Sequence, residues 1–162
     1  MQFSRIIILN SNEGSFEMSY NFYGSKDASN VHAINHTYKG IDTPNDLYGA
    51  LLHVWCEYTC TPRLRDEWSP DNPTLGQCAI TSFLAQDIFG GKVYGVPLEA
   101  GNVHCYNVVG DCMFDLTSEQ FGDEAMNYAG NPEQSRDIHF SRTEKKERYE
   151  YLCDKLKEYC GE

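Results

Sequence analysis

A helix bounded by turn signals and followed directly by a hairpin signal constrains this chain more than any other feature of its sequence. Apolar residues recur at helical spacing over residues 75–89, Thr74 and Gln77 match a capping box, and Gly90-Gly91 ends the segment. Gly110-Asp111 is typical of the two-residue turn of a β-hairpin. It lies between the last two of three predicted strands, which span residues 92–97, 103–109 and 112–116. A helix that leads into antiparallel strands predicts a mixed α+β fold.

The 162 residues are enough for one domain of ordinary size, and we expect a single domain over residues 1–162. Residues 1–42 form a predicted β-rich extension. Its three strands are expected at Phe3–Leu9, Ser15–Tyr23 and Val31–Tyr38. Residues 43–162 form the remaining module, which contains the helix and the hairpin.

Two further helices are predicted in this module. The first spans residues 43–58, and Thr43 is a natural N-cap for it. The second spans residues 143–160 and carries an apolar stripe. Cys153 and Cys160 lie on that stripe, and we therefore expect them in the core.

The charge balance excludes two classes of partner. The chain has 24 acidic and 13 basic residues, which gives a formal net charge of −11. Nucleic acids and anionic membranes bind basic surfaces, so we expect a small-molecule or peptide substrate instead. The apolar run Ile6–Leu9 is shorter than the apolar region of a signal peptide or a membrane span. These observations predict a cytoplasmic location, where the seven cysteines stay reduced.

Cys78 is the candidate nucleophile. It lies in the first turn of the predicted helix over residues 75–89, where the positive end of the helix dipole favours a thiolate. It also lies off the apolar stripe that anchors this helix. The alternative is that Cys78 is a small buried apolar residue, as most free cysteines are.

His104 and Asp115 are the candidate general base and its orienting carboxylate. If Gly110-Asp111 is a two-residue turn, both side chains lie on one face of the hairpin as diagonal neighbours. Asp115 can then fix the tautomer of the ring, and the other ring nitrogen is free to accept a proton from a thiol. Asn107 lies on the opposite face by alternation. The alternative is an ordinary cross-strand pair.

Nucleophilic attack on a carbonyl also requires hydrogen-bond donors for the oxyanion. The backbone N–H of Cys78 is one candidate, and the side-chain amides of Asn72 and Gln77 are two others. The sequence leaves the choice among the three open.

A structural zinc site is a further alternative for the remaining cysteines. Cys56 and Cys60 are four residues apart, and Cys105, Cys112 and His53 could complete a ligand set. However, the sequence has no CxxC pair, and alternation places Cys105 and Cys112 on the hairpin face away from His104. We therefore expect neither a metal nor another cofactor.

The segments NPTLGQCAITSFLAQDIFGG and HCYNVVGDCMFDLTSEQF together resemble the YunG-like bacterial family. The matching features are a GQC segment, a GG pair after the helix, a His-aromatic-Asn strand and a DLT-x-x-QF segment. The order of a Cys helix, a His strand and an Asp strand also resembles papain-like cysteine hydrolases in the broad sense. The resemblance covers residues 44–122, and Cys105 stands where an aromatic residue is expected.

This resemblance implies a papain-like or NlpC-like core, in which the nucleophile helix packs on a small antiparallel sheet. It places Cys78, His104 and Asp115 at the positions of a catalytic triad. The function that it implies is a cysteine hydrolase or acyltransferase, such as a peptidase or amidase, that acts on an amide, isopeptide or ester bond. The alternatives are a non-catalytic binding or regulatory module of the same fold and the zinc module described above.

Overall fold

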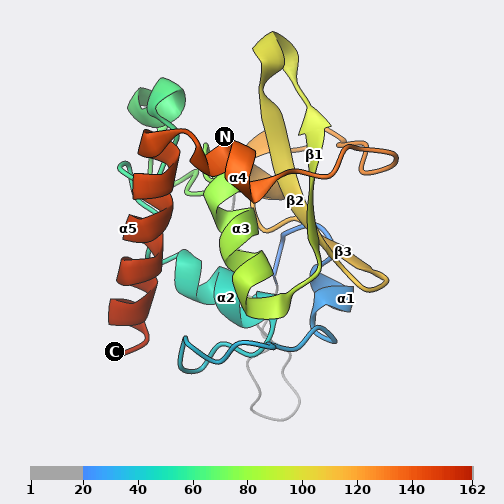
Figure 1. The fold of residues 1–162 in the computed structure, drawn as a ribbon, viewed down its shortest axis with the longest axis vertical. Coiled ribbons are helices and arrows are strands. Elements are labelled where there is room, and N and C mark those ends of the chain that lie inside the picture. The colour runs from blue at the N-terminus through green and yellow to red at the C-terminus, as the bar shows by residue number, and fades with distance from the viewer. Residues whose placement is uncertain (1–19, 162) are drawn as a thin grey trace, which may run out of the picture.

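The computed structural model describes residues 20–161 and has a mixed α+β architecture, as the sequence predicts (Figure 1). One antiparallel sheet has the order β1-β2-β3, formed by Lys92–Pro97, Val103–Val109 and Cys112–Phe114. The helices are α1 (Ser25–Ala28), α2 (Pro44–Leu51), α3 (Cys78–Phe89), α4 (Arg136–Phe140) and α5 (Thr143–Tyr159). Short 3₁₀ turns occur at Pro62–Glu67, Glu99–Gly101 and Ser118–Phe121.

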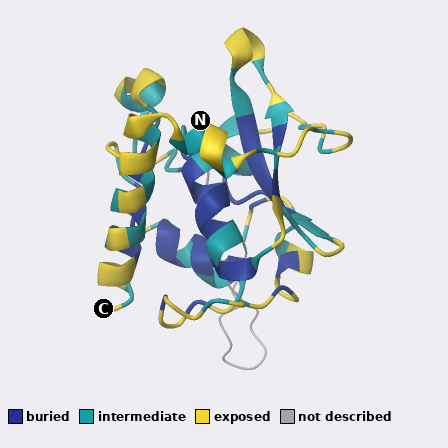
Figure 2. Cartoon of the chain, viewed as in Figure 1, coloured by how far each residue is buried: buried dark blue, intermediate teal, exposed yellow. Residues whose placement is uncertain are grey.

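Helix α3 lies at the centre of the fold, between the sheet and α5 (Figure 2). Its apolar stripe is fully buried and contains Ile80, Phe83, Leu84 and Ile88. From the other side, α5 contributes the fully buried Leu152 and Leu156 to the same core. Asn107 on β2 donates a 2.8 Å hydrogen bond to the Ser82 carbonyl of α3. This packing holds the start of α3 against the sheet.

The predicted hairpin register is confirmed for three residue pairs. Val109 faces Cys112, Val108 faces Met113 and Asn107 faces Phe114. Gly110 has a φ of 57°, the left-handed conformation that a tight hairpin turn of this kind requires. Strand β3 ends at Phe114, two residues before the predicted end. Asp115 instead donates its backbone N–H to the Tyr23 carbonyl at 3.0 Å, so the N-terminal segment takes over the pairing.

The prediction of a strand at Val31–Tyr38 is wrong. This segment is an irregular loop, because the N–H groups of Ile34 and Asn35 both bind the Ile88 carbonyl near the end of α3. The carbonyl at the end of the helix therefore accepts the hydrogen bonds that a neighbouring strand would otherwise accept. Several residues between 22 and 41 are buried in the same core as α2 and α3: Phe22, Ala28, Val31, Tyr38 and Ile41. The predicted strand Phe3–Leu9, and Ser15–Tyr23 up to residue 19, lie outside the described residues.

Helix α2 begins as predicted and ends early. Thr43 caps it in a capping box with Asp46, but the helix ends at Leu51 rather than at residue 58. After that end, the Thr59 hydroxyl accepts from the N–H of Cys56 and donates to its carbonyl, both at 2.9 Å. A side chain that satisfies both backbone groups of one residue competes with helical hydrogen bonds, and the chain turns there.

Helix α3 begins at Cys78, three residues later than predicted, and Thr74 and Gln77 form no capping box. Gln77 is the N-cap residue, but its buried side chain donates to the Cys56 carbonyl at 3.2 Å instead of accepting from the first turn. The first-turn N–H groups of α3 therefore have no side-chain cap. Cys78 consequently occupies the first position of the helix.

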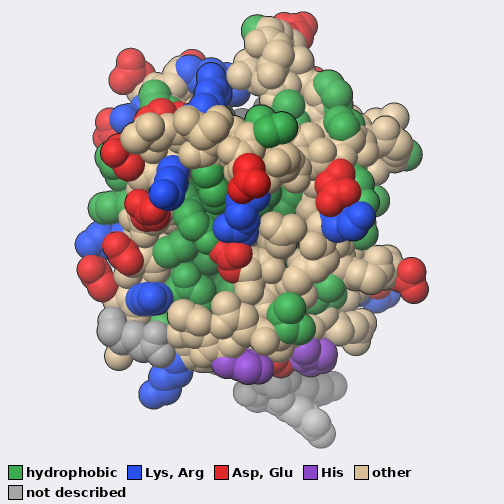
Figure 3. All heavy atoms as spheres, viewed as in Figure 1, with side chains coloured by type: hydrophobic (Ala, Val, Ile, Leu, Met, Phe, Trp, Pro, Cys, Tyr) green, Lys and Arg blue, Asp and Glu red, His purple; other side chains and the backbone are tan. Residues whose placement is uncertain are grey.

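Helix α5 matches its prediction over residues 143–159, and Cys153 and Cys160 pack half-buried against the core as expected. Tyr159, the last residue of α5, is 51% exposed and stacks on His53. On the face that Figure 3 shows, acidic and basic side chains are interspersed. Across residues 20–161, the structure contains no helix that is long and apolar enough to cross a membrane.

Candidate active site

Cys78 lies where α3 begins against the start of β2. Its side chain is half-buried, and its Sγ is 3.7 Å from the carbonyl oxygen of Val103. It packs beside a small apolar cluster formed by Phe83, Val93 and Cys105. The sulfur is thus held at the uncapped positive end of α3, which favours the thiolate.

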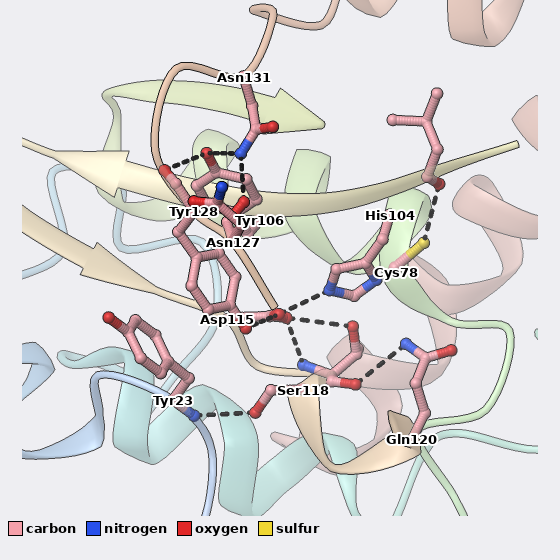
Figure 4. Close-up of polar contacts among 12 residues, drawn as sticks. Tyr23, Cys78, His104, Tyr106, Asp115, Ser118, Gln120, Asn127, Tyr128 and Asn131 are labelled. Atoms are coloured by element: carbon pink, nitrogen blue, oxygen red, sulfur yellow. Dashed lines mark hydrogen bonds and ion pairs between the residues drawn. The ribbon is translucent and has the colours of Figure 1, made fainter. Parts of the chain in front are cut away.

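His104 and Asp115 form a buried pair at the other side of the same site. Nε2 of His104 is 2.6 Å from Oδ2 of Asp115, and each side chain is only 1% exposed. Nδ1 of His104 has no hydrogen-bond partner within residues 20–161. Figure 4 shows the ring lying between Asp115 on one side and Cys78 on the other. The structure thus brings together the three residues that the sequence singles out.

Asp115 has further partners that the sequence did not reveal. Its Oδ2 accepts a 2.7 Å hydrogen bond from the Tyr128 hydroxyl, and its Oδ1 accepts a 3.1 Å bond from the Thr117 N–H. Tyr128 lies in a segment without regular structure and stacks on Tyr23 with ring centroids 4.3 Å apart. Phe121 covers the edge of His104, with centroids 4.6 Å apart at 88°. These contacts fix the orientation of the carboxylate and of the imidazole.

The pKa of His104 is raised to about 10. Burial alone lowers this pKa, but the hydrogen bond to Asp115 and the neighbouring sulfur of Cys78, with the negative charges of both groups, raise it by more. The pKa of Cys78 moves the other way, well below its ordinary value, because of a hydrogen bond from the Cys105 thiol and the nearby imidazole of His104, which together outweigh burial. The two shifts favour a thiolate–imidazolium pair at neutral pH.

Cys105 is a site residue that the sequence did not identify. Alternation correctly places it on the face of β2 opposite His104, where the neighbouring Asn107 binds α3. The same face lies against the start of α3, so the buried thiol of Cys105 lies beside Cys78. Its own pKa is raised well above the ordinary value, first by its hydrogen bond to Cys78 and then by burial. Cys105 therefore stays protonated and can act as a donor.

The two side-chain amides predicted as oxyanion donors differ in their surroundings. Gln77 is fully buried and donates to the Cys56 carbonyl. Asn72 lies in a short bridge with Ser69, and its side chain makes no hydrogen bond to any described residue. The uncapped backbone N–H of Cys78 is the third predicted donor, and it lies at the nucleophile itself.

A family model described as YunG protein matches residues 43–161, which is more than half of the chain. The chain belongs to the YunG family. A curated relative, "Uncharacterized protein YunG" of Bacillus subtilis (strain 168), is 36% identical over 55 residues, or 34% of this chain. The aligned part covers 47% of that relative, so the chain spans about half of its length. No solved structure matches the chain.

The zinc alternative finds no support in the described part of this YunG-family chain. No group of three or more His, Cys, Asp or Glu side chains within residues 20–161 could hold a metal ion. All seven cysteines are free thiols. The cysteines that the zinc alternative would use are therefore dispersed, while Cys105 is placed beside Cys78.

Replacing Cys105 with alanine should raise the pKa of Cys78, because the thiolate loses its neighbouring donor. A hydrogen bond to a charged group contributes about 1.5 kcal/mol, which corresponds to a roughly tenfold change in the protonation equilibrium of the thiol. The midpoint of Cys78 alkylation by iodoacetamide, measured as a function of pH, should move upward accordingly. Cys153→Ala is the matched control, and an equal shift in that variant contradicts a specific role for Cys105.

Proposed function

We propose that this YunG-family chain is a cysteine hydrolase or acyltransferase that acts on an amide, isopeptide or ester bond. In this proposal Cys78 is the nucleophile, His104 transfers protons, and Asp115 orients His104. One observation carries the proposal: a buried His104 binds Asp115 through Nε2 and turns its unpartnered Nδ1 toward Cys78. A cross-strand pair with a purely structural role would not require a thiol of lowered pKa beside Nδ1 of its histidine.

The chemistry follows from the two protonation states. The Cys78 thiolate attacks the carbonyl carbon, and the uncapped N–H groups at the start of α3 stabilise the oxyanion that forms. The proton on Nδ1 of His104 then passes to the leaving amine or alcohol, which leaves an acyl group on Cys78. Water or another nucleophile gives its proton to His104 and releases the acyl group. The acceptor decides whether the reaction is hydrolysis or transfer.

The order of the elements along the chain supports the interpretation of the fold as papain-like. The nucleophile stands on the first residue of a central helix, and the histidine and carboxylate follow on a hairpin packed against that helix. A cytoplasmic location, where thiols stay reduced, fits seven free cysteines of which one must remain a thiolate.

Labelling with acyl electrophiles tests the function directly. Alkyne-tagged acyloxymethyl ketones and activated esters should form a covalent adduct on Cys78, and Cys78→Ala should abolish it. Cys153→Ala removes a half-buried thiol whose pKa burial raises, and this variant should label like the wild type. If Cys78 forms no adduct faster than Cys153, the proposal fails and the non-catalytic binding module becomes the better interpretation.

A further inference from the structure

Lys145, in the first turn of α5, is a half-buried cation whose hydrogen-bond partner, His139, is uncharged. Its Nζ lies 2.9 Å from Nδ1 of His139 on α4. Nε2 of the same ring lies 2.9 Å from Oε1 of Gln134, so Nε2 carries the proton and Nδ1 accepts from Lys145. Burial and the charge of Lys145 lower the pKa of His139 to about 4. The histidine is thus a neutral acceptor that holds the ammonium group in place.

This pair lies beside the candidate nucleophile. Helix α4 lies beside α3 (Figure 1), and its His139 ring contacts Phe83, in the middle of α3, with centroids 5.2 Å apart. Phe83 belongs to the cluster that includes Cys105 and contacts Cys78. Burial lowers the pKa of Lys145, and the negative charge held by the Cys105–Cys78 pair opposes this effect. Lys145 is therefore within electrostatic range of the reacting sulfur.

The fold does not explain why a cation occupies this position. The first turn of a helix disfavours positive charge, and Lys145 has no ion pair with any carboxylate of residues 20–161. Two nearby acids are engaged elsewhere, since Glu144 pairs with Arg148 and Glu150 pairs with Lys146.

A second cation lies three residues earlier. Arg142, in the turn between α4 and α5, is exposed and likewise forms no ion pair within the described chain. Its positive charge contributes to lowering the pKa of both Lys145 and His139. In a chain with a net charge of −11, two cations that form no ion pair within residues 20–161 therefore gather at His139, whose ring packs on Phe83 of the cluster beside Cys78.

We propose that Lys145, assisted by Arg142, binds an anionic group of the substrate, so that the acyl donor is a carboxylate-bearing molecule. The inference rests on the proposed function, because it takes Cys78 as the nucleophile. Lys145 uses one of its three N–H donors on His139, which leaves two for a carboxylate. Without such a cation, the acidic chain and the Cys78 thiolate would repel an anionic acyl donor.

Two alkylating reagents that differ in charge test this proposal. Iodoacetate carries a carboxylate one carbon from the reacting centre, and iodoacetamide is neutral. Both need the same thiolate, so the ratio of their rates at Cys78 does not depend on the pKa of the thiol. Lys145→Met should lower the ratio of the iodoacetate rate to the iodoacetamide rate by roughly three- to tenfold at low ionic strength. Lys145→Arg should retain the ratio, and so should Lys146→Met on the exposed side of the same helix turn.

Salt dependence of the wild-type chain gives a second readout that needs no variant. Raising NaCl from about 20 mM to about 500 mM should lower the ratio, because salt screens the local attraction. If repulsion by the acidic chain as a whole dominated, the ratio of the two rates would instead rise with salt. A ratio that is unchanged in Lys145→Met, or that rises with salt, overturns the proposal. Loss of any preference of iodoacetamide for Cys78 over Cys153 would instead contradict the proposed function.

Discussion

Replacing His104 with alanine should slow the alkylation of Cys78 by iodoacetamide at about pH 6 by roughly thirtyfold. In the wild-type chain the hydrogen bond from Cys105 and the imidazole of His104 hold the pKa of Cys78 well below its ordinary value, against the opposing effect of burial. Without the imidazole, burial opposes the Cys105 hydrogen bond, and we expect a thiol of about ordinary pKa. An ordinary thiol is only about 0.3% thiolate at that pH, so the thiolate fraction should fall by roughly several hundredfold. A more basic thiolate is a stronger nucleophile, which offsets about a factor of ten.

The measurement has an internal standard in the same molecule. Peptide mass spectrometry after timed alkylation gives the rates of Cys78 and Cys153 together, and burial keeps the pKa of Cys153 high in every variant. His53→Ala is the matched control, because His53 is exposed and stacks on Tyr159. An unchanged Cys78 rate in His104→Ala contradicts the thiolate–imidazolium pair.

The sequence predicts the His104–Asp115 contact because two strong local rules apply to it. A two-residue turn at Gly110-Asp111 sets the register, and strict alternation then sets the face of every side chain. The end of α3 at Phe89 is also predictable, because the glycine pair that follows limits the helix, whereas its start lies three residues later than predicted. Rules of this kind involve residues that are close in sequence or paired across one turn.

The rest of the site depends on contacts between distant segments. Tyr128 reaches Asp115 from an irregular loop, and Lys145 lies near the site because α5, which carries it, packs against both α3 and α4. No periodicity or turn signal encodes either contact. Cys105 could have been identified from the sequence by asking which face of β2 covers the predicted nucleophile helix, since that face carries Asn107 as well.

The N-terminal segment shows how tertiary contacts override a local pattern. The β-branched and aromatic residues from Val31 to Tyr38 favour a strand, but Val31 and Tyr38 are buried against helices instead. The backbone of Ile34 and Asn35 finds its acceptor at the end of α3. A strand preference cannot be realised where the available hydrogen-bond partner is a helix carbonyl rather than another strand.

Replacing Asp115 with asparagine should destabilise the chain by about 3 kcal/mol at neutral pH. The carboxylate is buried and accepts from His104, Tyr128 and Thr117, so the substitution removes the charged acceptor that the buried imidazole and hydroxyl need. Urea unfolding followed by tryptophan fluorescence measures the difference. Asp137→Asn on exposed α4 should change the free energy of unfolding by less than about 0.5 kcal/mol. Equal effects of the two substitutions contradict a structural role for the buried pair.

The pH dependence of this destabilisation has a definite sign once Cys78 is replaced by serine. The lowered pKa of Cys78 stabilises the fold at high pH, and the raised pKa of His104 stabilises it at low pH. When both groups are present, these two opposite pH dependences of the free energy of unfolding partly cancel. In the Cys78→Ser background only His104 remains. Its folded pKa is raised above the unfolded value of about 6.5, so its contribution is fully present below that pH and is lost as the pH rises.

The free-energy difference between Cys78→Ser and the double variant Cys78→Ser/Asp115→Asn should therefore be largest at about pH 6. It should shrink as the pH rises toward about 10, the pKa of His104 in the intact chain. The hydrogen bond to Asp115 raises this pKa more than any other contact does, whereas burial lowers it, so the D115N chain lacks the stabilising proton at every pH in this range. Urea unfolding at several pH values measures the trend. A difference that stays flat or grows with pH contradicts a His104 proton held by Asp115.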